Sequence, residues 1–63
     1  TDIDPMKLPK AAREYLSENV PVKIKEASIN KDAKGIITYE ADIKGKAYIF
    51  DMTGKFMKTV EDD

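Results

Sequence analysis

The sequence predicts an α+β fold, in which one N-terminal helix packs on a four-stranded antiparallel meander sheet. Three observations lead to this prediction. The chain has 63 residues, which is enough for one small domain. Its apolar residues first recur with the period of a helix, in a segment that ends before a proline. The period then changes to two, and clusters of turn-forming residues divide the remainder into four strands.

One apolar stripe predicts the helix, over residues 9–18. Pro9 suits the first helical position, because its missing N–H would have no partner there. Asn19 is expected to end the helix in the left-handed conformation, and Pro21 keeps the residue before it out of the helical region. The residues of the stripe are Leu8, Ala11, Ala12, Tyr15 and Leu16.

Four segments with alternating apolar residues predict the strands. The first follows Pro21, and its apolar residues change parity halfway, which predicts a β-bulge near residues 25–26. The others cover residues 36–43, 46–51 and 55–60, separated by turns at 44–45 and 52–54. The loose segment 1–7 is predicted to be a flexible N-terminal arm, residues 8–60 the domain, and residues 61–63 an acidic tail.

The last two strands are apolar on both faces. If Gly54 closes a three-residue loop in the left-handed conformation, Phe50 lies opposite Phe56 and Ile49 lies opposite Met57. One short helix covers only one face of a sheet, and which face it covers is left open by the pattern. The uncovered face predicts an interface for a partner or for a second copy of the chain, a homodimer. The candidate interface residues are Ala47, Ile49 and Met57 on one face and Tyr48, Phe50 and Phe56 on the other.

The composition excludes much enzyme chemistry. The chain has neither Cys nor His, so the most common general base and the usual zinc ligands are missing. The pair Glu40 and Asp42 is typical of a solvated strand face rather than of an acid/base pair. Residues 51–55 are similar to the phosphorylated-aspartate motif of P-type ATPases, but a hairpin turn explains each of them. We therefore expect no enzyme activity, no catalytic or metal-binding residue and no cofactor.

The charges are distributed unevenly along the chain. The net charge is −1, yet five of the twelve acidic residues lie within the first four and last three positions, so residues 5–60 carry eleven basic residues against seven acidic ones. Because these lysines alternate with apolar residues as on a solvated strand face, we expect no nucleic-acid partner. The apolar runs are also too short for a membrane span.

The order of these features over residues 8–58 resembles the PepSY-like family of β-lactamase-inhibitor-like proteins. The residues that carry the resemblance are Leu8-Pro9, Ala12, Tyr15-Leu16, Asn19, Pro21, Lys23-Ile24, Tyr39 to Ile43, Gly45, Tyr48 to Asp51 and Gly54-Lys55-Phe56. The resemblance implies a periplasmic or secreted bacterial protein, with a single repeat of a helix on a four-stranded sheet.

Two functions are expected from these features. The first is an exported, non-enzymatic binding or inhibitory module that acts through its sheet surface, with an extracytoplasmic protein such as a peptidase or hydrolase as its partner. The alternative is a structural or assembly subunit whose main partner is itself. Neither the residues nor the resemblance identifies the target.

Overall fold

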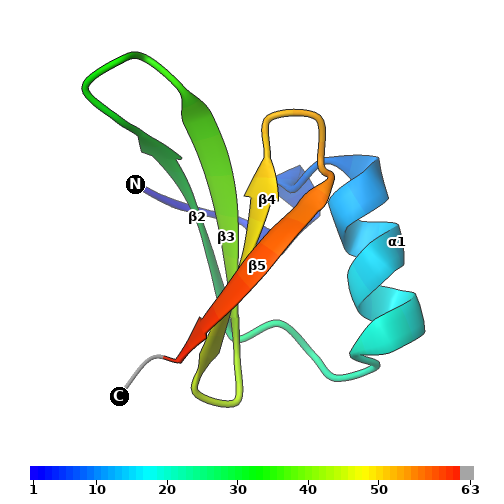
Figure 1. Ribbon diagram of the computed structural model, residues 1–63. Helices are drawn as coiled ribbons and strands as arrows, with labels where there is room; N and C mark the ends of the chain where they lie inside the picture. The colour runs from blue at the N-terminus through cyan, green and yellow to red at the C-terminus, as the bar shows by residue number, and fades with distance from the viewer. Residues whose placement is uncertain (62–63) are drawn as a thin grey trace.

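A five-stranded antiparallel sheet with one α-helix against one of its faces makes up the fold (Figure 1). The computed structural model describes residues 1–61, so most of the predicted acidic tail lies outside the described residues. In chain order the elements are β1, the 3-10 helix η1, α1 and β2 to β5, which span Asp2–Ile3, Pro5–Lys7, Lys10–Asn19, Glu26–Lys31, Ile37–Ile43, Lys46–Asp51 and Phe56–Glu61. The strands lie side by side in their chain order. The α+β class and the meander are confirmed, but the predicted number of four strands is wrong.

The additional strand, β1, lies in the segment that we expected to be an arm without regular structure. It pairs with β2, with Asp2 opposite Ser28 and Ile3 opposite Ala27. The following turn, η1, begins at Asp4, whose Oδ1 accepts a hydrogen bond from the Met6 backbone N–H at 2.9 Å. A two-residue strand has no measurable period, so only its pairing with β2 reveals it.

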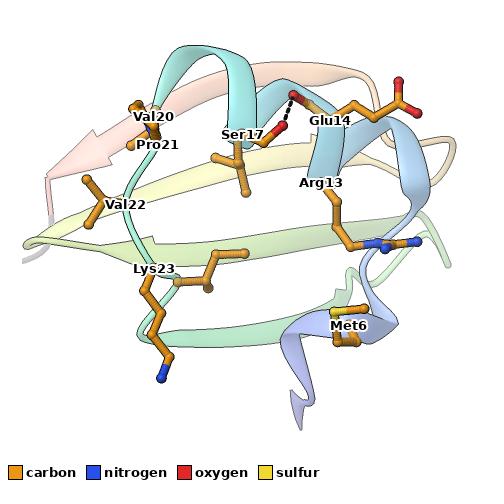
Figure 2. Close-up of a pocket in the computed structure, with 10 residues that line it drawn as sticks. Met6, Arg13, Glu14, Ser17, Val20, Pro21, Val22 and Lys23 are labelled. Atoms are coloured by element: carbon orange, nitrogen blue, oxygen red, sulfur yellow. Dashed lines mark hydrogen bonds between the residues drawn. The ribbon is translucent and has the colours of Figure 1, made fainter.

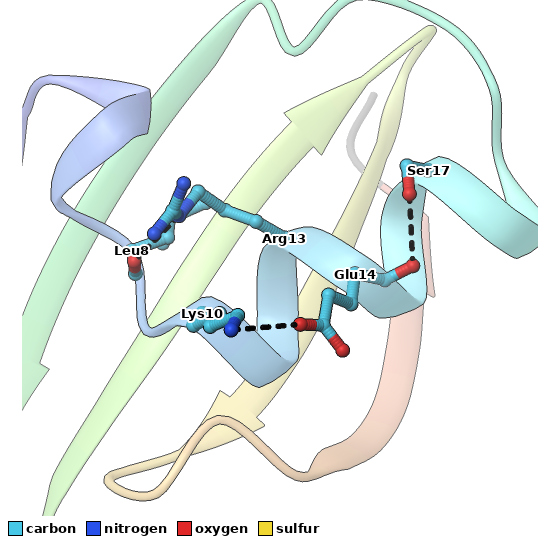
Figure 3. A network of polar contacts seen from close by, with 5 residues as sticks. All are labelled: Leu8, Lys10, Arg13, Glu14 and Ser17. Atoms are coloured by element: carbon cyan, nitrogen blue, oxygen red, sulfur yellow. Dashed lines mark hydrogen bonds and ion pairs between the residues drawn. The ribbon is translucent and has the colours of Figure 1, made fainter.

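The helix α1 begins and ends one residue later than predicted. Pro9 is its N-cap, with ψ of 146°, rather than its first helical residue. Asn19 is the last helical residue and is not left-handed; its Nδ2 donates to the Tyr15 carbonyl at 2.9 Å. Lys10 and Glu14 form an ion pair at 3.8 Å along the outer surface (Figure 3). The predicted stripe is confirmed for its buried members, Leu8, Ala12 and Leu16, whereas Ala11 is exposed.

The predicted bulge near residues 25–26 is not formed, because the strand starts only at Glu26. Residues 20–25 form an extended connector from α1 to β2. In it the Val22 N–H bonds the Val20 carbonyl, and the Lys25 N–H reaches the carbonyl of Asp42 in β3. The change of parity in the sequence therefore marks the border between connector and strand.

The turns predicted at 44–45 and 52–54 lie close to the predicted positions. At the 44–45 turn, Lys44 and Gly45 both have positive φ, 49° and 78°, which suits the twist of a two-residue hairpin. At the 51–55 turn, Gly54 has φ of 94° and donates to the Asp51 carbonyl. The predicted left-handed glycine is thus confirmed.

The pairing of β4 with β5 agrees with the prediction only at its first pair. Phe50 lies opposite Phe56, as expected, but a bulge follows and Ile49 lies opposite Lys58. The predicted pair of Ile49 with Met57 is therefore wrong. Because Met57 is the extra residue, Lys58 takes the place beside Ile49.

The helix covers the aromatic face of the sheet. The Tyr15 ring stacks on that of Phe56 at a centroid distance of 4.6 Å and meets that of Phe50 edge-on at 5.7 Å. Phe50 is fully buried, and Ala27, Ala41 and Ile43 join it in one core cluster with the buried residues of α1. This packing answers the question that the sequence left open, since Ala47 and Ile49 lie on the opposite face.

Candidate functional site

The sheet has one face that no other element of residues 1–61 covers, and we call it the open face. Its members follow from the strand register, because side chains alternate between the two faces. One row across the sheet is Asp2, Ser28, Glu40, Ile49 and Lys58, and the next is Glu26, Asp42, Ala47 and Val60. In Figure 1 this face is turned away from α1.

The structure separates the six candidate interface residues into two groups. Ala47 and Ile49 lie on the open face, and Met57 lies at the bulge with 53% of its surface exposed. Tyr48, Phe50 and Phe56 belong to the face under α1, where Tyr48 and Phe56 are partly buried. Phe50 has an exposed fraction of 0%, so its side chain has no surface to offer a partner.

Val60 is an apolar member of the open face that the sequence analysis did not include. It lies opposite Ala47 on the edge strand β5, with 45% of its surface exposed. Ala47 is itself buried, between Asp42 on one side and Val60 on the other. Ile49 and Val60 thus form an apolar patch over β4 and β5.

The charges on the strands of the open face are mainly negative. Within the described strands, the face carries the carboxylates of Asp2, Glu26, Glu40, Asp42 and Asp51, and its one basic residue is Lys58 on the edge strand. Lys31 and Lys46, by the alternation along β2 and β4, lie on the side of the helix. A count of charges along the chain does not show this segregation. The parity of the residues within each strand was the signal that could have shown it.

Asp42 has an unusual environment on the open face. Its Oδ1 is buried and accepts no hydrogen bond. A carboxylate oxygen that has lost water and gained no donor carries a free-energy cost. The open face therefore contains one carboxylate whose buried oxygen has no donor within the described part of the protein.

The Oδ1 atom of Asp51, in contrast, is engaged by its own turn. It accepts hydrogen bonds from the Thr53 hydroxyl at 2.6 Å, the Thr53 N–H at 2.8 Å and the Lys55 N–H at 3.0 Å. The hydrogen bond from the Thr53 side chain, followed by that from the Lys55 backbone, lowers the pKa of Asp51. These bonds account for the similarity to an ATPase motif, since the residues serve the turn.

A second concave surface lies on the helix side, between α1 and the 20–25 connector. Figure 2 shows this groove, with Met6 of η1 and Val22 of the connector on opposite sides of it. It has a volume of about 640 Å³ and an apolar floor that includes Leu16 and Ile24. Arg13 lies at its border, with its Nε bonded to the Leu8 carbonyl at 3.1 Å. We call it the helix groove.

Two structural observations bear on ligands and membranes. Across residues 1–61, the acidic residues do not gather into a group of three or more that could hold a metal ion. In the same part of the chain, α1 is too short and too polar to cross a membrane, and the structure contains no longer α-helix.

Comparisons with known proteins give no assignment: no family model, no curated protein and no solved structure matches the chain.

Proposed function

We propose that this chain is a non-enzymatic protein-binding module that works through the open face of its sheet. The observation that carries the proposal is the position of α1, which covers the aromatic face and leaves Ile49 and Val60 without cover. Apolar groups beside charged ones on an uncovered sheet are typical of a protein contact. The resemblance to the PepSY-like family adds the expectation of an exported bacterial protein that inhibits a peptidase or hydrolase.

The inhibitory part of the proposal is tested with a panel of purified peptidases and β-lactamases. The wild-type chain should lower at least one of these activities, and Ile49→Lys should restore it, because a lysine would interrupt the apolar patch. Ser17→Lys, on the exposed side of α1, is the matched control and should inhibit as the wild type does. If no enzyme of the panel responds, the inhibitory function is wrong; if both variants restore activity equally, the open face is not the contact.

A second candidate, a self-assembling subunit, is favoured by the free edge of β5. This strand pairs with β4 only, so its outer backbone groups are available to a strand of another copy. The bulge at Met57 and the charge of Lys58 oppose such pairing, because both are features that protect sheet edges. Light scattering over a range of concentrations decides this candidate.

A further inference from the structure

We infer that the surface which binds the open face is cationic, with lysine or arginine side chains next to apolar ones. This inference rests on the proposed function, since it takes the open face as the contact. It goes further by naming the chemistry of the partner, which neither the composition nor the resemblance indicates.

The first argument is the distribution of charge over the face. Asp2, Glu26, Glu40 and Asp42 lie on β1, β2 and β3, whereas the apolar patch lies on β4 and β5. Strands are about 4.8 Å apart, so the nearest carboxylates of the other strands, those of Glu40 and Asp42 on β3, lie about 5 to 10 Å from the apolar patch. This distance is comparable with the screening length at physiological salt, about 8 Å. A protein that buries the patch therefore lies within the field of the carboxylates.

The second argument is the environment of Asp42. Its unpaired Oδ1 lies in the row of Glu26, Ala47 and Val60, at the border between the acidic and apolar parts of the face. An additional negative group here would raise the free-energy cost of burying that oxygen without a donor, whereas a cation near it would lower this cost. The border is thus the point at which a basic side chain is favoured most.

A second copy stacked on the same face is disfavoured at low salt. Two such faces bring together ten carboxylates and two lysines, and like charges in a contact oppose binding. The face is also small. It is about 19 Å across five strands and about 20 Å along them, roughly 400 Å², which is half of what each partner buries in a standard stable interface. With so little apolar area, the charges decide the partner.

The experiment uses three capped seven-residue peptides that alternate leucine with lysine, serine or glutamate. Each is titrated into the ¹⁵N-labelled chain, and the amide shifts identify the face that binds. The lysine peptide should shift amides of Glu26, Glu40 and Ala47, and its affinity should fall about tenfold between 20 and 300 mM NaCl. The glutamate peptide should cause no shifts.

A pair of isosteric variants tests the role of the carboxylates. Glu26→Gln with Asp42→Asn should weaken binding of the lysine peptide at least about threefold, as expected for the loss of two charge pairs. Glu14→Gln with Glu18→Gln changes the net charge equally on α1, where both side chains are exposed, and should leave the affinity unchanged. The dispersion of the amide spectrum confirms that each variant is folded.

The outcomes separate this inference from the proposed function. If the serine peptide binds the open face as tightly as the lysine peptide, the face is a docking surface but the cationic partner is wrong. Should none of the peptides shift the open face, the proposed function is overturned as well. If the chain doubles its mass at 20 mM NaCl without peptide, and the same amides shift with its concentration, the occupant is a second copy and the inference fails.

Discussion

Asp32 and Asp51 hold two different turns by the same hydrogen bonds. In each turn, Oδ1 accepts from the backbone N–H groups two and four residues later, and the glycine three residues later has positive φ and donates to the aspartate carbonyl. The spacing Asp-x-x-Gly thus produces the same kind of turn at two positions, both at the same end of the meander. The two glycines nevertheless differ in their surroundings, which allows their roles to be separated.

Gly54→Ala should destabilise the protein more than Gly35→Ala. Both positions have positive φ, 94° and 84°, so each alanine costs about 1 to 2 kcal/mol in the left-handed conformation. At Gly54 a Cβ would also lie 2.8 Å from that of Pro9 and 3.0 Å from the Ala12 nitrogen, which adds about 1 to 3 kcal/mol of overpacking. At Gly35 the nearest such atom is a flexible lysine carbon at 3.8 Å.

Urea unfolding of the two variants measures this difference. Equal losses of unfolding free energy would show that the 51–55 turn is not closely packed against the start of α1. Val at position 54 should be worse than Ala, because a β-branched residue resists positive φ.

Asp51 should make stability depend on pH in the acidic range. Its pKa is lowered in the folded state, chiefly by the hydrogen bond from the Thr53 side chain, so the folded protein favours the charged form. The contribution is complete above the unfolded pKa, about 4, and is lost as pH falls through the lower folded value. The Asp51→Asn variant has no carboxylate to protonate at this position. It should therefore be less stable than wild type at pH 7, and the difference should shrink as pH falls through the lowered pKa of Asp51.

Thermal melting at several pH values checks this expectation, with Glu18→Gln as a control for the removal of an exposed carboxylate. The expectation is contradicted if the difference between wild type and Asp51→Asn stays constant from pH 7 to pH 2.

The attachment of α1 to the sheet depends on few side chains. Leu16 is 3% exposed and lies in the core cluster with Phe50. Leu16→Ala should therefore lower the free energy of unfolding by about 2 to 5 kcal/mol, a large part of the stability of so small a domain. Ser17→Ala, one residue later on the exposed side of the helix, should change it by less than about 0.5 kcal/mol. Denaturant unfolding followed by circular dichroism measures both, and equal effects would show that the apolar stripe is assigned to the wrong side.

The elements with a repeated pattern were predictable, and those defined by pairing were not. The helix stripe and the alternation over residues 37–43 each repeat often enough to indicate the type of secondary structure and the side of it that is buried. β1 is only two residues long. The bulge at Met57 inserts one residue into β5, and the residue types around it do not signal the insertion. Both depend on contacts with another strand, which local patterns do not contain.

The candidate site was predictable in part for the same reason. That one sheet face would lack a cover followed from the presence of a single short helix. The face that the helix chooses depends on packing: the rings of Phe50 and Phe56 fit against Tyr15, whereas Ile49 and Ala47 remain outside. Because the prediction paired Ile49 with Met57, it did not place Lys58 on the open face, where Lys58 lies beside Ile49.

Across the whole molecule, the segregation of charge sets opposite salt dependences for two kinds of association. Binding of a cationic surface to the open face gains from attraction, so added salt weakens it. Stacking of two open faces meets repulsion between their carboxylates, so added salt favours it. Salt therefore distinguishes the two modes even where both use the same apolar residues.

We therefore expect the average mass of the chain to stay that of a monomer at low salt. At millimolar concentration it should rise as NaCl increases from 20 to 500 mM, because the repulsion between acidic open faces is then screened. Ile49→Ser removes apolar surface without changing charge, so it should reduce the rise, whereas Ser17→Ala on α1 should not. Multi-angle light scattering gives the mass directly. A dimer that is strongest at low salt would mean that Lys58 pairs with carboxylates of the other copy, and the open face would then be self-complementary rather than repulsive.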